Sequence, residues 1–180
     1  IDQEIIQYTG KTATTFTGIT RGIGSSTTAA HSSGAPVGYA QWVTGNTAST
    51  VYITSTTANS GVTLLANGAA QVNQAGLYAV TYSAQIVNCG NGFDDAQLWF
   101  RINGSEIAYS SGRATVSATH AQLPGAYIMT VHNFYRFSAN DVFELRWRNT
   151  VGTIALATYA TLDGFPAAPA VTLFMQQIAS

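Results

Sequence analysis

The chain has 180 residues, a net charge of −1 and only 8% charged residues, with one lysine and three glutamates. Lys and Glu normally cover exposed helix faces, whereas the abundant Thr, Val, Tyr, Phe and Ile suit strands, so the composition argues against a helical protein and predicts an all-β chain. The absence of a basic cluster argues against a nucleic-acid partner, and no run approaches the roughly 20 apolar residues of a membrane span.

The N-terminal segment has the pattern of a short β-hairpin followed by an extended arm. Residues 4–9 and 14–20 are rich in β-branched and aromatic side chains on either side of Gly10-Lys11-Thr12, which predicts two strands and a turn. Residues 21–36 are dense in Gly, Ser, Thr and Ala without a period, which is typical of an extended loop. A two-stranded hairpin is not independently stable in water, so we expect it to need an external surface.

A domain boundary is predicted near Val37, which divides the chain into an N-terminal unit, 1–37, and a β domain, 38–180. Candidate strands in the second part recur about every 8 to 14 residues, a spacing typical of a sandwich or barrel. Several segments alternate apolar and polar side chains, as strands with one buried face do. These segments are 76–86, 96–102, 142–148 and 170–178. In 142–148 the polar face is charged, with Glu144, Arg146 and Arg148.

The segment 126–137 differs because it is apolar on both faces. Ile128 and Phe134 lie on one face of the predicted strand. The opposite face carries Tyr127, Met129, Val131, Tyr135 and Phe137. A neighbouring subunit is the expected cover for the second face, and a loop of the same chain is the alternative.

No common enzyme signature is present, and Gly22-Ile23-Gly24 does not continue into a dinucleotide fingerprint. His31, His120 and His132 have no second ligand at metal-binding spacing. The single cysteine, Cys89, cannot form an internal disulfide and is expected to be a small, partly buried residue. The sequence therefore assigns no catalytic, cofactor-binding or metal-binding residue and predicts no cofactor.

Two sets of carboxylates remain as candidates for acid–base chemistry of the kind that glycan hydrolases use. They are Asp94 and Asp95 with Glu106, and Asp141 with Glu144. Turns are the preferred interpretation of Asp94-Asp95 and of Asn140-Asp141. The oxygen-rich loop 88–95 leaves calcium open as an alternative, although it lacks the spacing of an EF-hand.

Three runs in the second part resemble the C1q and tumour-necrosis-factor-like jelly roll. They are GLYAVTYSA at 76–84, LWFRING at 98–104 and FSANDVFEL at 137–145. The resemblance covers about 38–180 and implies a two-sheet antiparallel jelly-roll sandwich that forms a compact homotrimer. Asn140 stands where many members of the family have glycine, which is a mild departure.

The N-terminal segment resembles a short module of structural and tail-fibre proteins of tailed phages. The runs that carry this resemblance are EIIQYTGKTATTFTGITRG at 4–22 and TTAAHSSGAPV at 27–37. It implies a place on the exterior of a virion, with the major capsid protein or a fibre or tail component as partner. The external surface that the hairpin needs is then expected on the particle or on a neighbouring subunit.

Together these observations predict a non-enzymatic, outward-facing homotrimer that decorates or stabilises a capsid or forms a fibre domain, docked through residues 1–37. The alternative is a tail-fibre tip that recognises host surface glycan, with exposed Trp42, Trp99 or Trp147 stacking on sugar rings. Each tryptophan is otherwise expected in the core or in the trimer interface. A glycan hydrolase is the third hypothesis, and the sequence leaves a head or tail location open.

Overall fold

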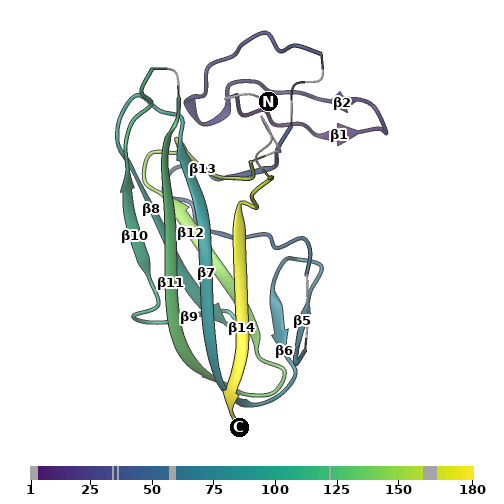
Figure 1. Cartoon of the computed structure of the whole chain (residues 1–180), viewed down its shortest axis with the longest axis vertical. Helices are drawn as coiled ribbons and strands as arrows, with labels where there is room; N and C mark the ends of the chain where they lie inside the picture. Colours follow the sequence, from purple (N-terminus) through teal and green to yellow (C-terminus); the bar gives the residue numbers. More distant parts are fainter. Residues whose placement is uncertain (1–3, 34, 36, 57–59, 122, 160–165) are drawn as a thin grey trace.

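The computed structural model describes residues 4–33, 35, 37–56, 60–121, 123–159 and 166–180. Two antiparallel sheets face each other, and a short hairpin lies at one end of the sandwich (Figure 1). In the described part, the one helical element is a 3-10 turn, Ile23–Ser25. None of the described helical structure is long and apolar enough to cross a membrane.

The first sheet, which we call the β7 sheet, is built around a long central strand. Its order is β11-β7-β13-β3, and β14 also pairs with β7. The strands are β3 (Ala40–Trp42), β7 (Gly76–Asn88), β11 (Gly125–Phe137), β13 (Ile154–Ala157) and β14 (Val171–Ala179). β11 follows β7 over its whole length, whereas β14 and β13 share the other edge of β7.

The second sheet, the β8 sheet, has the order β10-β8-β12-β6-β5, with β4 also paired to β12 and β9 to β8. Its longer strands are β8 (Asp94–Ile102), β10 (Gly112–Val116) and β12 (Val142–Asn149). Its shorter strands are β4 (Ser49–Thr50), β5 (Val62–Leu64), β6 (Ala70–Val72) and β9 (Ser105–Glu106).

The connections between the long strands cross from one sheet to the other. The chain passes from β6 to β7, from β7 to β8, from β10 to β11 and from β11 to β12, and each step changes sheet. This is the connectivity of a jelly-roll sandwich, so the predicted fold class is confirmed. The four alternating segments of the sequence correspond to β7, β8, β12 and β14.

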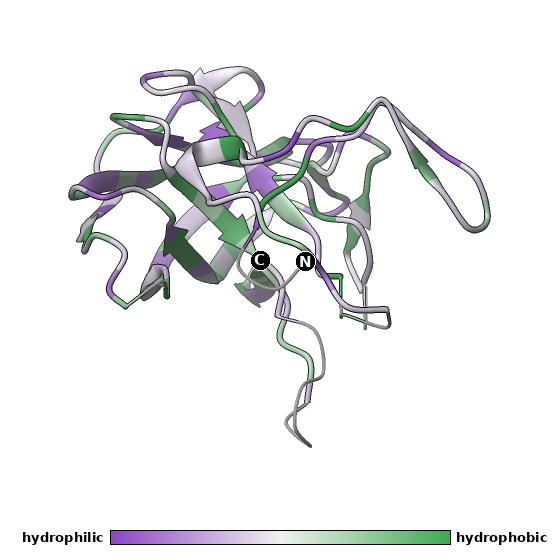
Figure 2. Cartoon of the chain, turned by 90° about the horizontal axis from the view of Figure 1, so that it is seen from above, coloured by the Kyte–Doolittle hydropathy of each residue, from purple (hydrophilic) through white to green (hydrophobic). Residues whose placement is uncertain are grey.

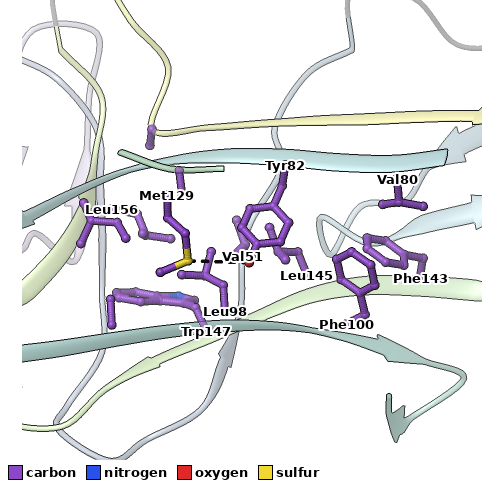
Figure 3. Close-up of a cluster of buried hydrophobic side chains, with 14 of the residues drawn as sticks. Val51, Val80, Tyr82, Leu98, Phe100, Met129, Phe143, Leu145, Trp147 and Leu156 are labelled. Carbon is purple, nitrogen blue, oxygen red and sulfur yellow. Dashed lines mark hydrogen bonds between the residues drawn. The ribbon is translucent and has the colours of Figure 1, made fainter. Parts of the chain in front are cut away.

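Alternate residues of the two sheets meet in one core, rich in aromatic rings (Figure 3). Phe100 contacts Phe143 edge to face at 5.0 Å and Tyr82 at 6.1 Å, and the Tyr82 hydroxyl donates to Met129 Sδ at 3.7 Å. Edge-to-face packing of this kind stabilises beyond the burial of area alone. Trp147 is also fully buried in this core, which makes it a core residue and not a surface tryptophan.

The N-terminal hairpin forms, but its turn lies further along the chain than expected. β1 (Gly10–Lys11) pairs with β2 (Phe16–Thr17), so the turn spans residues 12–15 and the predicted turn at 10–12 is wrong. The reason is local, because the Thr12 hydroxyl accepts hydrogen bonds from the backbone N–H groups of Thr14 and Thr15 and closes a side-chain turn.

The segment before the hairpin packs on the sandwich of its own chain. Ile5 contacts a small cluster made of Val87 on β7, Cys89 just after β7 and Ala155 on β13. Burial raises the pKa of the Cys89 thiol to about 11, so this thiol stays protonated at neutral pH. The chain therefore supplies a surface to Ile5 that we expected from a partner, while the division at residue 37 stays a prediction.

Candidate interaction surfaces

The outer face of the β7 sheet, turned away from the core, exposes large apolar side chains. Ile128 and Phe134 on β11 are each 61% exposed, and Phe174 on β14 is 56% exposed. Because no described segment covers this face, the expectation that a loop of the same chain covers it does not hold for the described residues. We call these three residues, with Thr81 between them on β7, the apolar face.

Polar side chains lie between the large apolar ones on this outer face, and some are bonded to each other, as the Thr130 hydroxyl is to Ser83 at 3.2 Å. The Thr81 hydroxyl lies 2.6 Å from His132 Nδ1, and the His132 ring contacts Phe134 at 4.8 Å. Thr81 pairs in register with His132 on one side and with Phe174 on the other. The face therefore presents two phenylalanines around a small polar centre and no carboxylate among these residues.

A second apolar patch lies at the edge of the sandwich formed by β10 and β11. Leu123, in the turn between these strands, is 59% exposed, and Tyr127 on β11 is 47% exposed. Tyr127 belongs by register to the inner face, opposite Ile86, but lies near the end of the edge strand, where the sandwich is open. This edge patch differs in composition and place from the apolar face.

The outer face of the β8 sheet is charged, as the alternation in 142–148 predicted. Of the seven cationic residues in the chain, four lie on the strands of this sheet: Arg101, Arg113, Arg146 and Arg148. Their register surrounds Trp99, which pairs directly with Arg146. The indole N–H of Trp99 donates to Glu106 Oε2, and this bond fixes the orientation of the ring. We call this group the arginine–tryptophan face.

No family model and no curated protein matches the sequence. A crystal structure of pika GITRL is similar over 68% of this chain and 82% of that chain, at 18% sequence identity and a TM-score of 0.35. A likeness of this strength carries no argument about ligands or assembly, so the fold assignment rests on the strand order of the chain itself.

Asp94 does not lie in a turn but opens β8, with its carboxylate buried against the turn between β12 and β13. Its two oxygens accept hydrogen bonds from the four backbone N–H groups of residues 150–153 and from the hydroxyls of Thr150 and Thr153. Burial alone would raise the pKa of Asp94, but these hydrogen bonds outweigh it and lower the pKa. A carboxylate so fully bonded is an anchor and has no capacity left for acid–base work or calcium.

The other candidate acids are also held by neighbours and do not form the predicted pairs. Asp95 points to the opposite face from Asp94, where Thr115 and Arg113 bind it and lower its pKa. Glu106 and Glu144 lie on either side of Arg101, at 3.9 and 3.6 Å. Asp141 accepts from Ser138 N at 2.8 Å and closes the predicted turn at Asn140-Asp141, which is confirmed.

In the described part of the chain, no group of three His, Cys, Asp or Glu side chains could hold a metal ion. The loop 88–95 is instead closed by Asn88, whose amide donates to Gly92 O and whose carbonyl accepts from Gly90 N. The histidines are dispersed: His31 lies beside Glu4, His120 in the turn before β11, and His132 on the apolar face.

Residues 4–33, which we call the N-terminal arm, contain a buried carboxylate that the sequence did not predict. The Glu4 side chain is 0% exposed and binds Arg21 through both oxygens. It also accepts from Gly22 N and Ala29 N and lies 2.8 Å from His31 Nε2. The hydrogen bonds from Arg21 hold the pKa of Glu4 well below its usual range, against the opposing effect of burial. All five of these residues fall in the two phage-like runs, but nothing in their spacing predicts the contact.

The three tryptophans have different environments. Trp147 is in the core, and Trp42 is half-buried with its indole N–H donating to Gly152 O at 2.8 Å. Trp99 is half-buried on the outer face of the β8 sheet and is the one among them that lies beside a cluster of charged groups. It is therefore the tryptophan best placed to meet a ligand.

Proposed function

We propose that this chain is a non-enzymatic structural protein of a tailed-phage virion, displayed on the particle exterior as a homotrimer. The observation that carries the trimer is the apolar face, because monomeric proteins rarely expose clustered large apolar side chains without a partner. The virion setting rests on the resemblance of residues 4–37 to a phage module. A capsid-decorating protein and a fibre domain both agree with it.

A ring of three copies needs two different patches on each subunit. In a closed ring the contact is heterologous, so one patch of each copy meets a different patch of the next. The apolar face with Phe134 and Phe174 is the first patch, and the edge patch with Leu123 and Tyr127 is the second. In this arrangement the β7 sheet faces the axis and the arginine–tryptophan face is turned to solvent.

The docking role falls to the N-terminal unit. The rings of Tyr8 and Phe16 lie 4.6 Å apart, tilted by 41°, and together with Val37 and Tyr39 they line a cavity of about 250 Å³ beside β3. The hairpin projects from the side of the sandwich (Figure 2). Loose packing on its own chain leaves these aromatic side chains available for a surface of the particle, such as the major capsid protein or a fibre or tail component.

Particles that lack this protein provide the test of docking. Full-length chain should bind such particles, and a chain without residues 1–37 should remain a trimer and fail to bind. Because the deletion uncovers Val87 and Cys89, a full-length variant with Tyr8→Ala and Phe16→Ala tests the hairpin with the Glu4 contacts intact. Binding of both variants at wild-type level would place the docking surface on the jelly roll and refute this assignment.

A second candidate function is recognition of host surface glycan by a fibre tip. The specific observation that favours it is Trp99, which lies half-buried among arginines on the face turned away from the proposed trimer contact. Aromatic rings beside polar groups are the usual means by which proteins bind sugar rings.

A further inference from the structure

We propose that the arginine–tryptophan face binds a carboxylated saccharide, with Trp99 stacking on the sugar ring and the arginines binding its carboxylate. The proposal deepens the second candidate function and rests on it. It does not depend on the trimer, because the β8 sheet and the β7 sheet present opposite outer faces of the sandwich.

The first argument is that the arginines keep donors without partners among the described residues. Arg101 makes no hydrogen bond there and approaches Glu144 and Glu106 only at 3.6 and 3.9 Å. Arg148 donates through Nε to Gln97 alone, at 3.1 Å, which leaves both of its Nη groups available. The Nε atoms of Arg101 and Arg146 are buried without a partner in the described chain, and Arg146 is fixed by the bond that its Nη1 donates to the Thr50 hydroxyl at 2.8 Å. Fixed guanidinium groups with available N–H donors are suited to carboxylates, which they bind through two parallel hydrogen bonds.

The second argument is the fixed aromatic ring in the middle of these donors. Trp99 pairs with Arg146 across the sheet, and its strand neighbours on the same face are Gln97 and Arg101. The hydrogen bond from its indole N–H to Glu106 fixes the orientation of the ring. An apolar ring face next to cations fits a ligand that combines a flat CH-lined surface with a negative charge, as an acidic pyranose does.

The third argument distinguishes a sugar acid from a phosphate-rich ligand. The face also carries Asp95, Glu106 and Glu144, so the four arginines leave a net charge of only +1 there. Nucleic-acid binding needs many uncompensated cations, and a face whose charges nearly balance does not supply them. Glu106, 52% exposed on its side chain, can instead accept hydrogen bonds from sugar hydroxyls beside Trp99. A ligand with one carboxylate per ring and several hydroxyls satisfies both features.

The probe is trigalacturonic acid, and its methyl ester is the matched neutral ligand. Full-length protein is titrated with each by isothermal calorimetry at low salt, with tryptophan fluorescence recorded in parallel. The acid should bind, and the ester should bind at least about tenfold more weakly because it cannot accept charge-assisted hydrogen bonds. Arg148→Gln and Trp99→Leu should each weaken binding of the acid about tenfold. Lys11→Gln, which removes the same charge from the hairpin, should leave it unchanged.

Several results would overturn the proposal. They are no binding of the acid at millimolar concentration, equal binding of acid and ester, equal loss in Lys11→Gln and Arg148→Gln, or full competition by inorganic phosphate at the same concentration. If Trp99→Leu does not fold, Arg148→Gln and the ester still decide the outcome. The mass of the protein in solution is measured by light scattering in the same samples, so absence of saccharide binding and absence of a trimer are separate results.

Discussion

At the scale of single residues, Asp94 determines how the turn between β12 and β13 is held. Four consecutive backbone N–H groups, those of residues 150–153, point at its carboxylate and are bonded to it. Buried N–H groups without acceptors are strongly destabilising, and here one side chain satisfies all four. The turn therefore depends on a residue more than 50 positions earlier in the chain.

Replacing Asp94 with Asn should lower the free energy of unfolding by about 2 to 4 kcal/mol at pH 7, because the amide nitrogen meets N–H donors where an oxygen accepted them. The folded-state pKa of Asp94 is lowered, so its contribution is present above the unfolded pKa and is lost as the pH falls through the folded pKa. The difference between wild type and variant should therefore shrink from pH 7 to pH 3.

Urea unfolding at the two pH values measures this difference. Asp95→Asn is the matched control, because Asp95 is the adjacent carboxylate and its contacts with Arg113 and Thr115 lie on the outer face. Its loss of stability should be smaller than that of Asp94→Asn. Equal losses at both positions would show that the bonds to residues 150–153 have no special weight.

At the scale of elements, the N-terminal arm is fastened to itself by Glu4. The carboxylate joins the segment before the hairpin to Arg21 and to Ala29 in the following loop, while Ile5 contacts the sandwich. The arm is therefore a folded unit with one buried polar centre, although its two strands have only two residues each.

Glu4→Gln should loosen the arm and leave the jelly roll intact, because a neutral amide cannot replace the paired bonds to Arg21. Hydrogen exchange followed by mass spectrometry should show faster exchange in residues 4–33 and unchanged exchange in β7 and β8. Gln7→Ala, at an exposed neighbouring position, is the control and should exchange like the wild type. Uniform acceleration across β7 and β8 would contradict the independence of the two parts.

The contact between Glu4 and Arg21 also sets the pH range in which the arm stays folded. An ordinary glutamate titrates at about pH 4.3, whereas the pKa of Glu4 is held well below that value by Arg21. The stability that Glu4 contributes is present above its unfolded pKa and is lost only as the pH falls through the lower folded value. The exchange of the arm, relative to that of an unstructured chain at the same pH, should therefore be as slow at pH 4 as at pH 7.

At the scale of the whole molecule, the two outer faces of the sandwich divide the work that we propose. One exposes the large apolar side chains Phe134 and Phe174 and has no carboxylate on β7, β11 or β14, and it suits contact between subunits. The other carries four of the seven cations and suits contact with a ligand in solvent. Such a division is expected where one face is buried on assembly and the other is not.

Light scattering of the wild type should give the mass of a trimer at micromolar concentration. Phe174→Asp should raise the dissociation constant on the order of 100-fold, since it places a charge in an apolar contact. Phe93→Asp is the matched control, because Phe93 is 72% exposed but lies in the turn between β7 and β8, away from the apolar face. A monomeric wild type, or dissociation by Phe93→Asp alone, would refute the proposed interface.

The sequence by itself determined the all-β class, the long alternating strands and the doubly apolar character of 126–137. These follow from the two-residue period of a strand, which is a local property of the backbone and is visible in a short window. The charged alternation of Arg146 and Arg148 was visible for the same reason.

Only the tertiary structure decided which side chains meet. Arg101 and Arg146 are brought to one face by the pairing of β8 with β12, and Glu4 meets Arg21 across the hairpin. The sequence predicted a turn at Asp94, because the N–H groups that bind its carboxylate belong to a turn far away in the chain. Even the hairpin register shifted, since the Thr12 hydroxyl outweighed the turn preference of Gly10. Contacts of this kind depend on strand register and long-range packing, which a single sequence does not specify locally.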